Sequence, residues 1–110
     1  MNISILGGGS WGSALAIHLA KKGHNVKIWE FFKEQADEMQ QKRFCKLLPD
    51  VKLPENIFVS HKIDDVLVKA ELIMLVVPSD KVEATIEKAK SSISKQPIII
   101  CSKGLGEGLT

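Results

Sequence analysis

Three glycines near the N-terminus have the spacing of a phosphate-binding turn. Gly7-x-Gly9-x-x-Gly12 follows a short apolar run and precedes residues that favour a helix. In such a turn the first glycine permits a sharp change of direction, the second lets a pyrophosphate approach the backbone, and the third lets helix and strand pack closely. The first helical turn, including the N–H groups of Ser10 and Trp11, would then face the phosphates. This context favours dinucleotide binding; the alternative is a plain strand-to-helix turn.

An acidic residue follows at the distance that ribose recognition needs. Glu30 ends a predicted second strand, 18 residues after Gly12, and the usual interval is about 20. Its carboxylate would accept hydrogen bonds from both ribose hydroxyls of NAD and repel the 2′-phosphate of NADP. The arginine that often accompanies NADP is missing, although Lys33 could partly replace it, so we expect NAD as cofactor, with NADP possible. The alternative for Glu30 is a solvated charge at the end of a strand.

Two adjacent aromatic residues, Phe31 and Phe32, come directly after Glu30. Two such side chains at a loop tip are costly in water, so at least one should cover apolar surface. That surface is either the adenine of a bound cofactor or the helix that follows. The residues alone favour neither over the other.

The elements that must position these residues alternate between strand and helix, which is typical of a parallel sheet. Gly23 is expected to end the first helix at the C′ position, Ser79 to cap the fourth, and residues 44–56, with Pro49 and Pro54, to form a loop. The predicted strands are 3–6, 25–30, 57–59, 72–77 and 98–101, and the predicted helices are 10–22, 33–43, 63–69 and 80–90. We therefore expect an α/β fold, a Rossmann-like doubly wound parallel sheet of about five strands and about four helices, truncated before its second half is complete.

Composition excludes several classes of protein. A chain of 110 residues with 45% hydrophobic and 25% charged side chains suits one ordered domain. The formal net charge is +2 and Arg43 is the sole arginine, so we expect no nucleic-acid partner. Cys45 and Cys101 lack the spacing of metal ligands, so we expect no metal site. Free thiols, the absence of a signal sequence and the absence of a long apolar run predict a soluble cytoplasmic protein with no membrane span.

The segment Gly7-Gly8-Gly9-Ser10-Trp11-Gly12-Ser13-Ala14-Leu15-Ala16 resembles the N-terminal fingerprint of the NAD(P)-dependent glycerol-3-phosphate dehydrogenases, with Trp11 inside the glycine motif. The resemblance continues through residues 48–56, 76–79 and 102–104, whose sequences are LPDVKLPEN, VVPS and SKG. It implies an oxidoreductase that interconverts dihydroxyacetone phosphate and sn-glycerol 3-phosphate with NAD(P)(H), in glycerolipid synthesis. The implied partner is a small phosphorylated substrate.

The resemblance also implies roles for individual residues. The turn from Gly7 to Gly12 would hold the pyrophosphate, Phe31 would contact the cofactor, and Lys103 would lie at the catalytic cleft, contacting substrate and cofactor. A lysine at the carboxyl end of a parallel strand is well placed to meet a phosphorylated anion. The family's main general base is a lysine in a helical C-terminal domain. Residues 1–110 are therefore expected to be the dinucleotide-binding domain of a larger enzyme, without that catalytic domain and inactive alone.

Two other functions stay open. One is the cofactor domain of another dehydrogenase, of the 6-phosphogluconate or 3-hydroxyisobutyrate type, although Trp11 and the Leu-Pro rhythm of residues 48–56 argue against it. The other is a non-catalytic module that senses NAD. The apolar run 98–101 predicts an exposed sheet edge, which is prone to pair between chains, so we expect a homodimer.

Overall fold

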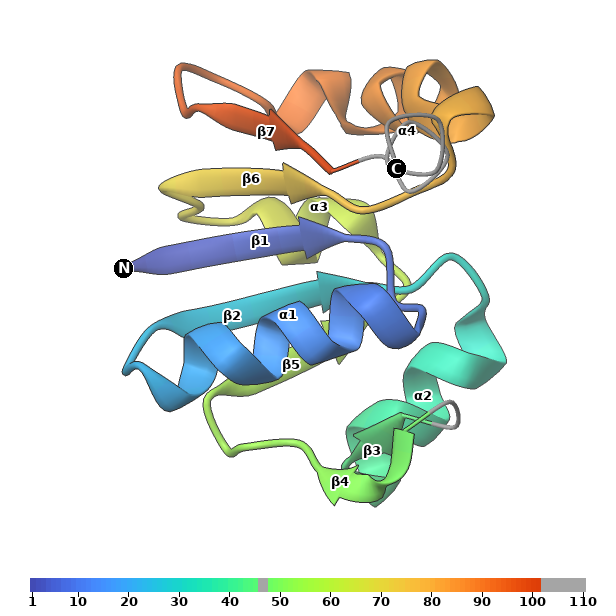
Figure 1. Ribbon diagram of the computed structural model, residues 1–110. Coiled ribbons are helices and arrows are strands. Elements are labelled where there is room, and N and C mark those ends of the chain that lie inside the picture. The colour runs from blue at the N-terminus through green and yellow to red at the C-terminus, as the bar shows by residue number, and fades with distance from the viewer. Residues whose placement is uncertain (46–47, 102–110) are drawn as a thin grey trace, which may run out of the picture.

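Five parallel strands form the central sheet of the molecule. The structure, a computed structural model, describes residues 1–45 and 48–101. Its strands in this sheet are β1 (Asn2–Leu6), β2 (Asn25–Trp29), β5 (Ile57–Ser60), β6 (Leu72–Leu75) and β7 (Ile98–Ile100). Their order across the sheet is β5-β2-β1-β6-β7 (Figure 1). The chain thus builds outward from β1 on one side and from β6 on the other, which confirms the predicted Rossmann-like sheet.

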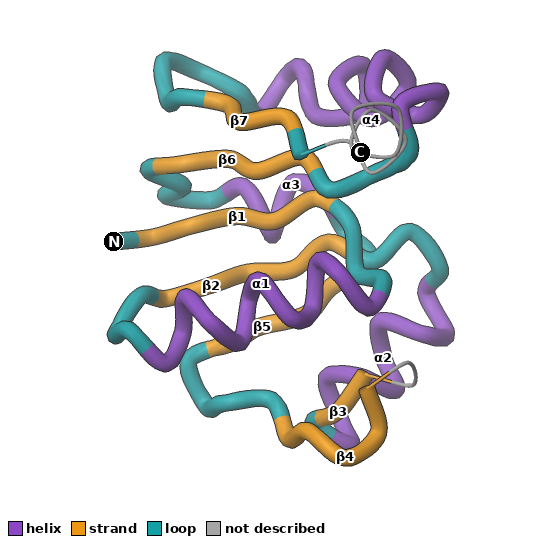
Figure 2. The backbone as a smooth tube through the Cα atoms, in the orientation of Figure 1, coloured by secondary structure: helices purple, strands orange, loops and turns teal. Residues whose placement is uncertain are grey.

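Helices cover both faces of this sheet (Figure 2). Helices α1 (Ser10–Lys21) and α2 (Lys33–Lys42) pack on one face, and α3 (Ile63–Leu67) and α4 (Val82–Ala89) pack on the other. Alternate residues of a strand point to opposite faces, so Ile5 is buried on the α1 side and Leu6 on the α3 side. Burial on both faces explains why β6 consists only of apolar residues.

The end of α1 has the conformation that its sequence predicts. Gly23 has a φ of +98°, in the left-handed region that glycine adopts at little cost. Its N–H donates to the carbonyl of Ala20 (3.0 Å), and the N–H of His24 donates to that of Leu19 (3.3 Å). These two bonds form a Schellman motif, which satisfies carbonyls that the helix end would otherwise leave open. The predicted C′ role of Gly23 is confirmed.

The predicted loop at residues 44–56 is wrong in part. It contains an antiparallel pair, β3 (Phe44–Cys45) and β4 (Leu48–Lys52), with Phe44 opposite Lys52. A two-stranded ribbon consists only of edge strands, where a proline is tolerated because its missing N–H faces away from the partner. Pro49 is therefore compatible with β4, and proline content alone did not exclude a strand here.

The start of α4 also differs from the prediction. Residues Ser79–Lys81 form a short 3-10 turn, closed by the N–H of Lys81 donating to the carbonyl of Pro78 (2.8 Å). The α-helix begins only at Val82, and no side chain caps either element. The tighter turn uses an early N–H in an i to i−3 bond, so Ser79 does not act as the predicted cap.

Candidate functional site

The glycine turn follows β1 at the carboxyl end of the sheet and runs past the end of β2 into α1 (Figure 1). Gly7 has a φ of +136°, and a Cβ there would overlap the carbonyl oxygen of Val76. A Cβ at Gly12 would overlap the carbonyl oxygen of Gly7. Both glycines are therefore required by the fold, one for the turn out of β1 and one for the close approach of α1, as predicted.

Gly9 is the glycine that leaves space for a ligand. A Cβ at this position would meet no atom within 4 Å, so the fold does not need glycine there. Gly9 precedes α1, whose first intrahelical bond runs from the N–H of Ser13 to the Gly9 carbonyl (2.9 Å). The first three N–H groups of any α-helix lack an intrahelical acceptor, and no acidic residue lies in this first turn. The residues present thus fit an anionic group such as a pyrophosphate.

Gly8, which the sequence motif leaves unassigned, is required by Glu30. A Cβ at Gly8 would overlap the Glu30 carboxylate and lie 3.2 Å from both Cβ and Cδ of that side chain. The carbonyl of Gly8 also accepts a hydrogen bond from Oγ of the buried Ser13 (3.1 Å). Each glycine of the run 7–9 therefore has a different function.

Glu30 is buried, with 7% of its surface exposed, so its interpretation as a solvated charge is wrong. Its Oε1 accepts a hydrogen bond from the backbone N–H of Phe32 (3.3 Å). Burial raises the pKa of the carboxyl group above its ordinary value, and the backbone N–H groups of Phe32 and Phe31 oppose that rise. The carboxylate thus lies between Gly8 of the glycine turn and the backbone of Phe32 in the connection that follows β2. A contact between Glu30 and a ribose stays a prediction.

The aromatic residues after β2 form an exposed cluster. Phe31 and Phe32 are 57% and 58% exposed, so each ring leaves more than half of its surface open. Phe31 lies edge-on to the buried Trp29 (5.9 Å between ring centroids) and to Phe32 (5.1 Å). The ammonium of Lys88, from α4, lies over the Phe31 ring, 5.3 Å from its centroid. Trp11, in the first turn of α1, is also exposed. Ring surface is thus available for a base to stack on.

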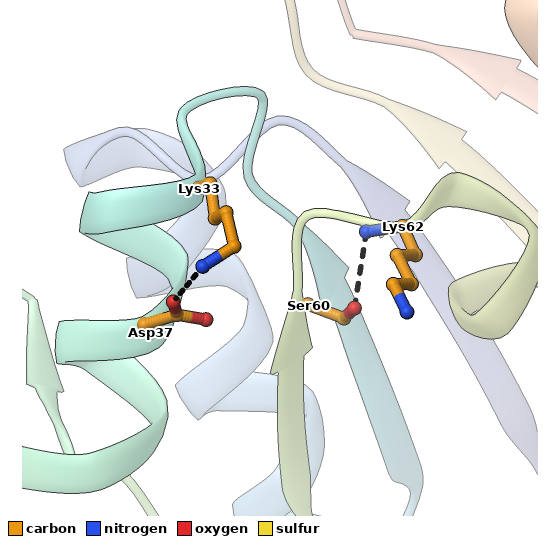
Figure 3. Close-up of polar contacts among 4 residues, drawn as sticks. All are labelled: Lys33, Asp37, Ser60 and Lys62. Atoms are coloured by element: carbon orange, nitrogen blue, oxygen red, sulfur yellow. Dashed lines mark hydrogen bonds and ion pairs between the residues drawn. The ribbon is translucent and has the colours of Figure 1, made fainter.

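A separate polar hollow of about 330 Å³ lies between α2 and the connection from β5 to α3. Of its lining residues, Asp37 is paired with Nζ of Lys33 (3.1 Å), and the backbone N–H of Lys62 donates to Oγ of Ser60 (3.0 Å; Figure 3). None of the predicted site residues lines it; the lining residues are Asp37, Gln40, Gln41, Val59, Ser60, His61, Lys62 and Asp65.

The predicted site residues that the structure describes thus lie on the glycine turn, at the start of α1 or at the end of β2. They are Gly7, Gly9, Ser10, Trp11, Gly12, Glu30 and Phe31. Lys103 lies outside the described residues. Sequence reasoning missed Gly8, Lys88 and the hollow. None had a local signal, because each depends on contacts between distant segments.

Comparison with known proteins identifies the family. Residues 2–110 match the family described as NAD-dependent glycerol-3-phosphate dehydrogenase N-terminus. A glycerol-3-phosphate dehydrogenase [NAD(P)+] of Fusobacterium nucleatum is 38% identical over 109 residues, which are 97% of this chain and 32% of that protein. The crystal structure of glycerol-3-phosphate dehydrogenase from Coxiella burnetii superimposes with a TM-score of 0.88 at 36% identity, covering 93% of this chain and 32% of that one.

More distant structures share the fold. Glycerol-3-phosphate dehydrogenase from Saccharomyces cerevisiae has a TM-score of 0.77 at 20% identity, over 94% of this chain and 33% of that one. The chain spans about a third of the length of the curated relatives it matches. No helix among the described residues is long and apolar enough to cross a membrane. By its match over residues 2–110, the chain belongs to the N-terminal family of the NAD-dependent glycerol-3-phosphate dehydrogenases.

Proposed function

We propose that this chain binds NAD at the carboxyl end of its sheet, as the dinucleotide-binding domain of an oxidoreductase. The observation that carries the proposal is the open space at Gly9 beside the N-terminus of α1. Three further glycines with no such space, Gly7, Gly8 and Gly12, hold the surrounding backbone in place. Family membership supports the same conclusion.

Each part of the cofactor has a group suited to it. The N–H groups of Ser10, Trp11 and Gly12, reinforced by the helix dipole, bind the pyrophosphate. The Glu30 carboxylate accepts hydrogen bonds from the ribose hydroxyls, and the Phe31 ring contacts the adenine. The bound nicotinamide supplies or accepts a hydride. The chain itself orients the cofactor, and the negative charge of Glu30 favours NAD over NADP while leaving NADP possible.

The reaction we propose is the interconversion of dihydroxyacetone phosphate and sn-glycerol 3-phosphate, as the names of the relatives suggest. Lys103 would contact the phosphorylated substrate and the cofactor, because it follows β7 in the sequence and ligands of such folds bind beyond the carboxyl ends of the strands. The main general base would come from a helical domain that these residues do not include, so the chain alone would bind cofactor without turnover. We place the whole enzyme in the cytoplasm and in glycerolipid synthesis.

The exposed edge of the sheet supports self-association. In β7, Ile98, Ile99 and Ile100 are 37%, 46% and 50% exposed, and no described strand pairs with its outer edge. The opposite edge differs, since Gln40 accepts a hydrogen bond from the N–H of Val59 (2.8 Å). We therefore propose a homodimer that pairs through β7. Light scattering should give a dimer that Ile99→Lys converts to a monomer; a monomeric parent chain at high concentration would contradict this.

Calorimetric titration with NADH and NADPH tests the cofactor site. Gly9→Asp should abolish binding, because the added carboxylate would occupy the space of the pyrophosphate and repel it. Asn25→Asp is the matched control, since it adds the same charge at the opposite end of the strands and should bind as the parent does. Gly9→Ala should bind more weakly yet unfold at the parent's temperature, because its Cβ meets no protein atom. Undiminished binding by Gly9→Asp, or none by the parent, would refute the proposed site.

A further inference from the structure

A lysine from the other half of the sheet contacts the connection that follows β2. Lys88 belongs to α4, which follows β6, whereas Phe31 follows β2. The Lys88 ammonium nevertheless lies over the Phe31 ring, 5.3 Å from the centroid. It is brought there by packing, because the next residue, Ala89, is fully buried in the same cluster as Trp29. The Phe31 ring lies edge-on to Trp29 in turn. The position of Lys88 is thus determined by the fold.

The two lysines near this connection differ in their electrostatic surroundings. Lys33 is the nearer in sequence, but its ammonium is paired with the Asp37 carboxylate at 3.1 Å (Figure 3). Lys88 forms no ion pair with any carboxylate of residues 1–45 and 48–101, and within those residues its ammonium interacts with the Phe31 ring. A cation over an aromatic face keeps most of its charge available to an anion. Lys88 is therefore the better counter-charge for an added phosphate.

From this placement we infer that Lys88 is a specificity-determining residue, which binds the 2′-phosphate of NADP and offsets the repulsion from Glu30. The inference rests on the proposed function, because it takes Glu30 to face the ribose and Phe31 the adenine. It assigns to Lys88 the role that the sequence alone left to Lys33 as a partial replacement for the missing arginine. That role would let a chain with an acidic residue after β2 bind NADP as well as NAD, because attraction from Lys88 would oppose repulsion from Glu30.

The inference predicts a selective loss of NADPH affinity. Calorimetry with the full 110-residue chain would compare the parent with Lys88→Met, and Lys90→Met would serve as control because it removes a lysine from the turn after α4. Lys88→Met should weaken NADPH binding by about fivefold or more, the effect of a partly screened ion pair worth about 1 kcal/mol. NADH binding should change by less than about twofold, and both control affinities should be those of the parent.

Two further measurements separate this inference from its alternatives. The ratio of the affinities for 2′,5′-ADP and 5′-AMP, which differ only in the 2′-phosphate, should fall in Lys88→Met, and the fall should shrink at high salt. Lys33→Met should leave that ratio unchanged. If Lys88→Met weakens both nucleotides equally or neither, or if Lys33→Met lowers the ratio, the inference is wrong while the proposed function stands. A parent chain that binds neither NADH nor NADPH would refute both.

Discussion

Replacing Gly8 by alanine tests whether Glu30 makes the middle glycine necessary. Gly8 does not have a positive φ, so alanine is compatible with its backbone. The added Cβ would overlap the Glu30 carboxylate and lie 3.2 Å from its Cβ and Cδ. The carboxylate could swing away, but it is buried and accepts the Phe32 N–H. Displacing it loses a hydrogen bond worth about 1 kcal/mol, whereas leaving it in place overpacks a buried site at a cost of about 1–3 kcal/mol.

We therefore expect Gly8→Ala to lower the free energy of unfolding by about 1–3 kcal/mol. In a Glu30→Ala background the same change should cost less, because the methyl group then enters space that the side chain has vacated. The coupling between the two sites should be about 1–2 kcal/mol, within the range for residues in direct contact.

A double-mutant cycle by urea unfolding at pH 7 measures this coupling. Gly9→Ala supplies the control. Its Cβ meets no atom within 4 Å, so this substitution should show no coupling to Glu30→Ala. If the coupling for Gly8 is below about 0.5 kcal/mol, the usual limit of additivity, steric conflict with Glu30 does not explain this glycine.

Two further predictions concern single side chains. Burial raises the pKa of Glu30 above its ordinary value of 4.5, so the folded state binds the proton more tightly than the unfolded state does. The contribution of Glu30 to stability is therefore complete below pH 4.5 and is lost as the pH rises through the folded-state pKa. As the pH rises through that range, the free energy of unfolding of Glu30→Gln should therefore increase relative to that of the parent chain. A difference between the two chains that does not change with pH would contradict this. Arg43→Lys should lose about 1–3 kcal/mol of stability, because the guanidinium donates to the carbonyls of Pro54 (2.8 Å) and Ile57 (2.6 Å). In the same thermal unfolding experiment Lys42→Ala, which removes only an exposed pair at 4.0 Å, should change stability little, and equal losses would refute the role of Arg43.

The central sheet could be predicted because its strands are short apolar runs separated by glycine, proline and amphipathic segments. Burial on both faces makes residues 72–75 uniformly apolar, and that pattern depends on no distant contact. The ribbon of β3 and β4 could not be predicted in the same way. Its strands have 2 and 5 residues, one of them with a proline. The N–H of Leu53 donates to the carbonyl of Arg43 (2.7 Å), and the Leu53 side chain is buried, so tertiary contacts help to hold this segment.

In the candidate site, too, some residues could be predicted from a local sequence pattern, whereas others depend on contacts between distant segments. The φ of +136° at Gly7 and the close approach of Gly12 to the Gly7 carbonyl are local features that a sequence motif records, whereas the contact of Gly7 with the Val76 carbonyl is not. Gly8 depends on Glu30, 22 residues later, and Lys88 reaches Phe31 from 57 residues away. An exposed lysine on a helix has no distinguishing pattern, so the cation beside Phe31 becomes visible only once α4 is packed against Trp29.

If Glu30 faces the ribose as proposed, its contact with Gly8 couples the residue at position 8 to cofactor preference. The Glu30 carboxylate occupies the volume that any side chain at position 8 would need. A related chain with alanine or serine at position 8 should therefore have a shorter side chain at position 30, and under the proposed function it would lose the charge that repels a 2′-phosphate. Introducing Glu30→Ala should thus make Gly8→Ala tolerable and shift the chain toward NADPH, with Lys88 as the remaining charge at the site. The double variant tests both effects at once: a stable double variant that still prefers NADH would mean that Glu30 fills space without selecting the cofactor.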